Sequence, residues 1–84
     1  MGNIDKLTKR LLTKPKDFNW AELKKLLNAF GYKETNAGKT SGSRIRFLHD
    51  NHAPIVLHKP HPRRILKRYQ IKLIIETLKL RRQL

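Results

Sequence analysis

The sequence contains no cysteine, few aromatic residues and only 6 acidic residues among 84. Without cysteine the chain can form neither a disulfide framework nor a zinc site built on thiolates. It also lacks an apolar run long enough to span a bilayer or to serve as a signal peptide. These absences favour a reducing compartment. We therefore expect a cytoplasmic protein with no membrane partner.

Basic residues dominate the charge. The 20 Lys and Arg side chains give a formal net charge of +14. This excess is far beyond what solubility requires, so it indicates a polyanionic partner, of which nucleic acid is the commonest. An acidic protein or an anionic membrane surface is the alternative. A chain of 84 residues forms one domain with a modest core, so we expect no deep enclosed cavity and no small-molecule cofactor.

Apolar side chains at helical spacing predict three helices, over residues 4–12, 20–30 and 67–82. The first is followed by Pro15, which lacks an amide donor and disfavours helix at the preceding residue. The second has the clearest limits. Asn19 and Glu22 have the spacing of a capping box, and Gly31 stands where a left-handed residue ends a helix.

Most of the aromatic side chains are predicted to lie in the core. Phe18 and Leu23 have the spacing of a hydrophobic staple around the start of the second helix. For Trp20 beside them, core packing is favoured over stacking on a nucleic-acid base. Tyr69 and Leu73 are one turn apart in the last helix, and packing is the first interpretation for them too.

Three strands are predicted, over residues 32–38, 43–49 and 54–58. In the second strand Ile45 and Phe47 alternate with Arg44 and Arg46, as expected for a strand with one buried face. The last two strands are separated by a short turn and form a hairpin. Residues 59–64 are too rich in proline for regular structure.

The fold class that follows is α+β. Three antiparallel strands must cover one apolar face, and the helices over 20–30 and 67–82 each have one apolar side to cover it. The prediction is a two-layer sandwich of one sheet and two helices, to which the first helix is an addition.

The uncovered face of this sheet is predicted to be cationic. If Ile45 and Phe47 face the helices, then Arg44, Arg46 and His58 face outward, and the flanking loops add hydroxyl and basic groups. Arginine suits phosphate through its bidentate geometry. Solvation alone would explain an isolated pair of arginines, but the overall charge favours binding. The candidate nucleic-acid contacts are Lys39, Ser41, Ser43, Arg44, Arg46, Lys59, Arg63 and Arg64.

The four histidines form two closely spaced pairs, His49 with His52 and His58 with His61. This spacing occurs in metal sites. No cysteine or carboxylate cluster accompanies either pair, however, and the surrounding positive charge repels a cation, so no metal site is expected. His49 and His52 are interpreted as ordinary turn residues. His58 can present its imidazole at a strand end, although a structural or solvated role is the alternative.

Four stretches, in this order along the chain, resemble the HicA toxin family: "ELKKLLNAFGY", "GSRIRF", "PIVLHKPH" and "QIKLIIETL". The resemblance covers about Trp20 to Leu80. It implies a fold like that of the double-stranded-RNA-binding domain over residues 18–84, with residues 1–17 as a helical extension. It also implies a ribonuclease toxin of a type II toxin–antitoxin system that cleaves mRNA without a metal ion, and a HicB-like antitoxin partner.

The family pattern Gly-Ser-His is altered here, because Gly42 and Ser43 are followed by Arg44. Arginine stays protonated and cannot act as a general base, but it can hold a phosphate and stabilise its developing charge. The second family histidine corresponds to His58. The resemblance therefore gives Arg44, His58 and His61 as candidate catalytic residues, with charge supplied by Arg44 and proton transfer by His58 or His61.

Two other functions remain open. The same basic face could bind RNA or an acidic partner without cutting it, and the missing family histidine supports that alternative. A DNA-binding regulator is disfavoured, since a helix-turn-helix needs a tight turn between adjacent helices and the segment around Pro15 is a poor one.

Overall fold

The computed structural model describes residues 3–36, 44–60 and 63–84. The elements in chain order are α1 (Asn3–Leu12), α2 (Trp20–Ala29), β1 (Lys33–Asn36), β2 (Arg44–Leu48), β3 (Ile55–His58) and α3 (Arg68–Leu80). The predicted α+β class, the three helices and the three strands are confirmed. The outer ends of the first two predicted strands, at residues 37–38 and 43, lie outside the described residues. Among the described helices, none is both long and apolar enough to cross a membrane.

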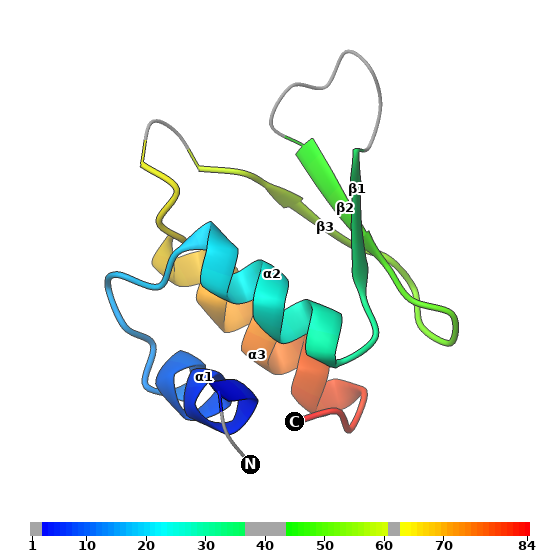
Figure 1. The fold of residues 1–84 in the computed structure, drawn as a ribbon, viewed down its shortest axis with the longest axis horizontal. Helices are drawn as coiled ribbons and strands as arrows, with labels where there is room; N and C mark the ends of the chain where they lie inside the picture. Colours follow the sequence, from blue (N-terminus) through cyan, green and yellow to red (C-terminus); the bar gives the residue numbers. More distant parts are fainter. Residues whose placement is uncertain (1–2, 37–43, 61–62) are drawn as a thin grey trace.

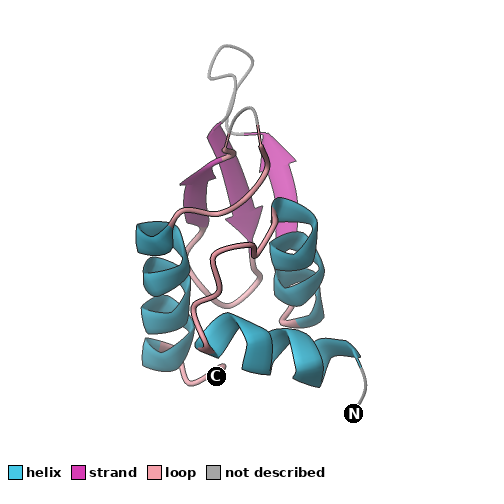
Figure 2. Cartoon of the chain, turned by 90° about the vertical axis from the view of Figure 1, so that its left-hand side faces the viewer, coloured by secondary structure: helices cyan, strands magenta, loops and turns pink. Residues whose placement is uncertain are grey.

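The elements are arranged in layers (Figure 1). Helices α2 and α3 lie side by side and cover one face of the sheet. Helix α1 crosses them on the side away from the sheet, as Figure 2 shows from a second direction. Without α1, the order is helix, three antiparallel strands, helix, consistent with the expected resemblance to the double-stranded-RNA-binding domain.

The sheet has the strand order β1-β2-β3, and both neighbouring pairs are antiparallel. Along β2 the side chains alternate between exposed and buried, and β3 does the same. Four of these side chains enter the core, each at most 5% exposed: Ile45, Phe47, Ile55 and Leu57. Because paired residues in an antiparallel sheet lie on the same face, the predicted hairpin and its facing are confirmed.

Helix α2 begins and ends as predicted. The Asn19 side chain accepts the Glu22 amide at 2.8 Å, and the Glu22 carboxylate accepts the Asn19 amide at 3.0 Å. Gly31 follows the helix with a φ of +97°, a conformation that side-chain-bearing residues rarely adopt. The staple residues Phe18 and Leu23 are both fully buried. The capping signals in the local sequence therefore predict the start of α2 correctly.

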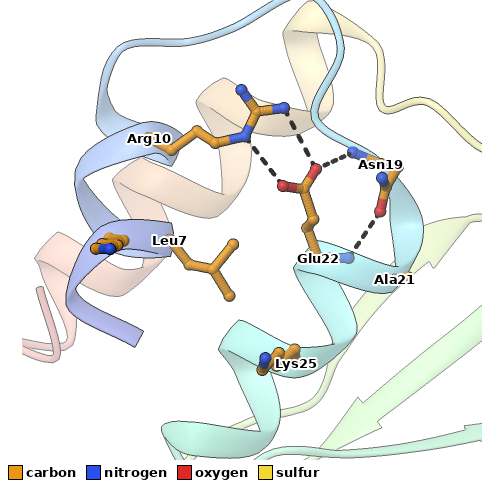
Figure 3. A pocket seen from close by; sticks show the side chains of 7 residues that line it. Leu7, Arg10, Asn19, Ala21, Glu22 and Lys25 are labelled. Atoms are coloured by element: carbon orange, nitrogen blue, oxygen red, sulfur yellow. Dashed lines mark hydrogen bonds and ion pairs between the residues drawn. The ribbon is translucent and has the colours of Figure 1, made fainter. Parts of the chain in front are cut away.

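Helix α1 is attached to the start of α2 by an ion-pair network (Figure 3). Arg10 donates to the Glu22 carboxylate at 3.0 Å and to Asp17 at 2.9 Å. Burial raises the pKa of Glu22, but hydrogen bonds from Arg10 and from the Asn19 amide outweigh it, so that the pKa is lowered overall. Leu11 of α1 is fully buried in the common core. The added helix thus completes the hydrophobic core.

The residues directly before α3 have more order than the sequence suggested. Ile65 forms an isolated antiparallel bridge with Asn19. Around it, the Trp20 amide donates to the Arg64 carbonyl at 2.7 Å, and the Leu66 amide donates to the Phe18 carbonyl at 2.8 Å. Leu66 is 3% exposed. This pairing connects the entry of α3 to the entry of α2, and no strand pattern in the sequence indicated it.

The interpretation of Tyr69 and Leu73 as packed residues is wrong. Their side chains are 64% and 44% exposed. The inward face of α3 consists of Gln70, Ile71, Ile74, Ile75 and Leu78. Tyr69 and Leu73, one turn apart, fall on the opposite side of the helix.

The histidines of the β2–β3 turn have a structural role rather than that of ordinary turn residues. His49 Nε2 lies 3.1 Å from the Phe30 carbonyl oxygen, and its Nδ1 accepts the Asn51 amide at 2.9 Å. Since Nδ1 is an acceptor, the proton is on Nε2, which donates to Phe30. The ring also packs in a tilted contact on Tyr32 and edge-to-face against His52, with centroids 4.7 Å apart in both pairs. The imidazole therefore joins the turn to the end of α2.

Arg81 holds the same turn from the end of α3. Its guanidinium donates to the Tyr32 hydroxyl at 2.8 Å and to the Ala53 carbonyl at 2.9 Å. The Tyr32 hydroxyl in turn donates to Gln83 at 2.6 Å. Arg81 therefore joins the end of α3 to the hairpin turn.

This cluster predicts a pH dependence of stability. Burial, followed by the charges of His49 and Arg81, lowers the pKa of His52 below its ordinary value. The unfolded chain therefore binds a proton at His52 more readily, and the stabilisation present above the ordinary pKa is lost as the pH falls. We expect the urea midpoint to fall between about pH 7.5 and about pH 5, and to fall less in His52→Gln. Equal falls in both proteins would contradict this role.

Candidate nucleic-acid interface

The face of the sheet that the helices leave uncovered is built by three rows of paired side chains. The register places Arg44 opposite His58, Thr35 and Val56 on either side of Arg46, and Lys33 opposite Leu48. On β2 and β3 these are the residues that alternate with the buried ones. The outward direction predicted for Arg44, Arg46 and His58 is therefore what the structure shows.

Arg44 and His58 are direct cross-strand partners. Both side chains are exposed and lie on the same face. Directly opposed residues in antiparallel strands have Cβ atoms about 4.5–5.5 Å apart, well within the reach of an arginine side chain. A guanidinium and an imidazole can thus contact the same phosphodiester group. They lie at the end of the hairpin opposite to the His49 and His52 turn.

A buried side chain of α3 hydrogen-bonds to the backbone of His58. Gln70, which is 2% exposed, donates from Nε2 to the His58 carbonyl at 2.9 Å. Its Oε1 accepts the Lys67 amide at 3.0 Å, at the start of α3. One amide side chain therefore joins the last residue of β3 to the first turn of α3. Sequence reasoning missed Gln70, although its place three residues after the N-cap was a usable signal.

Lys59 does not lie on this outer face. It continues the alternation of β3 on the inner side, and its ammonium nitrogen is 5.8 Å from the centroid of the Trp20 ring. With Arg64 and Lys24 it lines a shallow pocket beside the start of α2, which also contains Glu34. The pocket is a second cationic area. Because Lys59 points to the inner side of the sheet, this area is separate from the outer face that carries Arg44.

The Trp20 ring at this pocket belongs to the core. It is 3% exposed and lies 5.6 Å from the Phe47 ring, and its Nε1 donates to Glu34 at 3.4 Å. Glu34 also pairs with Lys24 at 3.3 Å. The prediction that Trp20 packs in the core is confirmed.

The remaining candidate contacts are only partly placed. Arg63 is exposed in the segment that leads to α3. Four candidates lie outside the described residues: Lys39, Ser41, Ser43 and His61. From the described part of the chain, the outer face thus brings together Arg44, Arg46 and His58. It offers two guanidinium groups and one imidazole.

The decisive comparison is with protein-family models. The model described as the HicA toxin of bacterial toxin–antitoxin matches residues 20–80, which is well over half of the chain. The chain belongs to the HicA toxin family. Comparisons with curated proteins and with solved structures gave no match. Membership identifies the protein as the toxin of a toxin–antitoxin pair and confirms the resemblance found in the sequence. Helix α1 lies before the matched residues.

The role of Gln70 in holding β3 predicts a specific loss of stability. In Gln70→Leu the His58 carbonyl and the Lys67 amide lose their buried partner, which costs about 1–3 kcal/mol in the free energy of unfolding. Urea denaturation measures this loss. The exposed Asn28→Leu on α2 is the matched control and should stay within about 0.5 kcal/mol of the wild type. A Gln70→Leu protein as stable as the control would show that the hydrogen bonds contribute nothing.

Proposed function

We propose that this HicA family member is an endoribonuclease that cleaves mRNA in the cytoplasm without a metal ion, and that a HicB-like antitoxin neutralises it. The observation that carries the proposal is the register that sets Arg44 opposite His58 on an exposed sheet face. The net charge of +14 supports a polyanionic substrate. Toxin family membership supports a substrate whose cleavage is harmful to the cell.

The chemistry that suits these groups is attack by the RNA 2′-hydroxyl on the adjacent phosphorus. This reaction needs removal of the hydroxyl proton, stabilisation of negative charge on the phosphorane, and a proton for the departing 5′-oxygen. Arg44 is permanently charged and supplies the stabilisation, because a guanidinium matches two phosphate oxygens. Arg46, in the next row of the same face, positions the neighbouring phosphate.

Proton transfer falls to an imidazole. His58 lies on the exposed face opposite Arg44, and an imidazole can take a proton in one step and return it in the next. His61 follows three residues later and is the second candidate. Attack by an internal nucleophile also explains why the proposal needs no metal ion, since neither a metal-bound water nor a Lewis acid is required.

Removal of the imidazole tests this assignment. On a mixed mRNA transcript in EDTA, His58→Ala should cleave about 10²–10⁴-fold more slowly than the wild type. His52→Gln provides a control that loses an imidazole at the far end of the hairpin and should cleave at the wild-type rate. Undiminished cleavage by His58→Ala, lost only when His61→Ala is added, would assign proton transfer to His61. Undiminished cleavage in the double variant would refute imidazole catalysis.

Restoring the family residue gives a second test. Arg44→His adds an imidazole opposite His58, so that separate groups can act as base and acid. We expect faster cleavage, by about 10²-fold, together with weaker binding of uncleaved RNA because a phosphate contact is lost. Single-turnover cleavage and gel retardation measure the two effects. Slower cleavage by Arg44→His would show that charge at this position matters more than proton transfer.

A second function is favoured by one specific observation, the replacement of the family histidine by Arg44. A chain that binds RNA through Arg44, Arg46 and His58 without cutting it would retard a transcript on a gel and leave it intact. In that case Arg44→His would convert a binder into a nuclease. The wild-type protein in EDTA distinguishes the two functions directly.

A further inference from the structure

Helix α3 has a second apolar face, opposite to the one that packs in the core. The buried side of the helix consists of Gln70, Ile71, Ile74, Ile75 and Leu78. On the other side Tyr69 is 64% exposed, Leu73 is 44% exposed and Leu80 is 88% exposed. With Glu76 between the two leucines, these residues form a stripe along the outer side of α3. Large apolar side chains aligned on an exposed helix face indicate an interaction surface.

The spacing within this outer stripe is that of a coiled-coil seam. Successive members, from Tyr69 through Leu73 and Glu76 to Leu80, are four, three and four residues apart, which matches alternating d and a positions of a heptad. The only interruption is Glu76. A single polar residue in such a seam specifies register and partner at a cost in stability.

The residues beside the stripe determine which charge a partner helix must carry. In the same heptad frame Lys72 and Lys79 occupy g positions, whose charges determine which helix pairs with which. Both are exposed. A partner helix therefore needs acidic residues along the edge that meets these lysines, together with a donor opposite Glu76.

We propose that the outer stripe of α3 is the docking surface for an acidic amphipathic helix of the antitoxin. The inference rests on the proposed function only in naming the antitoxin as the protein that provides this helix. Helix α3 packs under the inner face of the sheet (Figure 1). Arg44 and His58 lie on its outer face. The docking surface thus anchors the antitoxin at a place separate from that face.

A second copy of this chain does not fit the same surface. Each copy carries a formal charge of +14, so close approach is opposed by repulsion over the whole molecule. In an antiparallel pair the g-position lysines of the two copies would face each other, and two copies of Glu76 would add unpaired carboxylates to the seam. Charge complementarity selects a different, acidic chain.

The test uses a synthetic peptide as the probe. It has three heptads, Leu at the a and d positions, Glu at e and g, and one Lys at the central d position. Saturable one-to-one binding to the full-length protein is expected in fluorescence anisotropy. Leu73→Ser should raise the Kd at least about tenfold, as for an interface anchor. Leu12→Ser, which removes an equally exposed leucine from α1, should change it less than about twofold.

A charge reversal separates the stripe from general attraction between a basic protein and an acidic peptide. Lys72→Glu with Lys79→Glu should weaken binding of the acidic peptide at least about tenfold and create binding of a peptide with Lys at e and g. Lys9→Glu with Lys25→Glu makes the same change in net charge on α1 and α2. This control should bind both peptides like the wild type.

Three results would overturn the proposal. The first is equal binding of a scrambled peptide of the same composition, which would show general charge attraction. The second is dimerisation of the protein that Leu73→Ser abolishes. The third is binding to anionic vesicles that requires Leu73. All variants are checked for folding by circular dichroism, and their cleavage of RNA is measured in parallel. If the acidic peptide does not bind while RNA is still cleaved, the docking surface is rejected and the ribonuclease proposal is unaffected.

Discussion

The structure depends above all on the pairing register between β2 and β3. Burial of Ile45 and Phe47 against the helices fixes that register, because a slip of one residue would turn every side chain of β2 to the other face. The same constraint places Arg44 opposite His58. The arrangement of the outer face is therefore a consequence of core packing, and Arg44 and His58 need no direct contact with each other to stay aligned.

The hairpin is held at both of its ends by polar side chains. At one end the buried Gln70 binds the carbonyl of His58, and at the other Arg81 binds Tyr32 and the turn at Ala53. Gln70 is buried, and a buried polar group with satisfied hydrogen bonds fixes one geometry more sharply than apolar contacts, which tolerate small shifts. A small protein with a modest core can in this way hold the outer face of its sheet in one geometry.

Much of this could be predicted from the sequence because the signals are local. The capping box at Asn19, the alternation around Arg44 and the left-handed Gly31 each require only a few neighbouring residues. The bridge at Ile65 and the hydrogen bond from Gln70 to His58 join segments that are farther apart in the chain, and no periodicity in the sequence predicts them. Lys59 was expected beside the cationic outer face. It directly follows the outward-facing His58, so its side chain turns to the inner side, toward Trp20.

The central claim is that the Arg44 and His58 face cleaves RNA through the 2′-hydroxyl. The most direct measurement is the chemistry of the fragment ends formed by the wild-type protein in EDTA. The account predicts a 2′,3′-cyclic phosphate on one fragment and a 5′-hydroxyl on the other. Fragments with 3′-hydroxyl and 5′-phosphate ends would require attack by water, and an intact transcript would show binding without cleavage. Either result would contradict it.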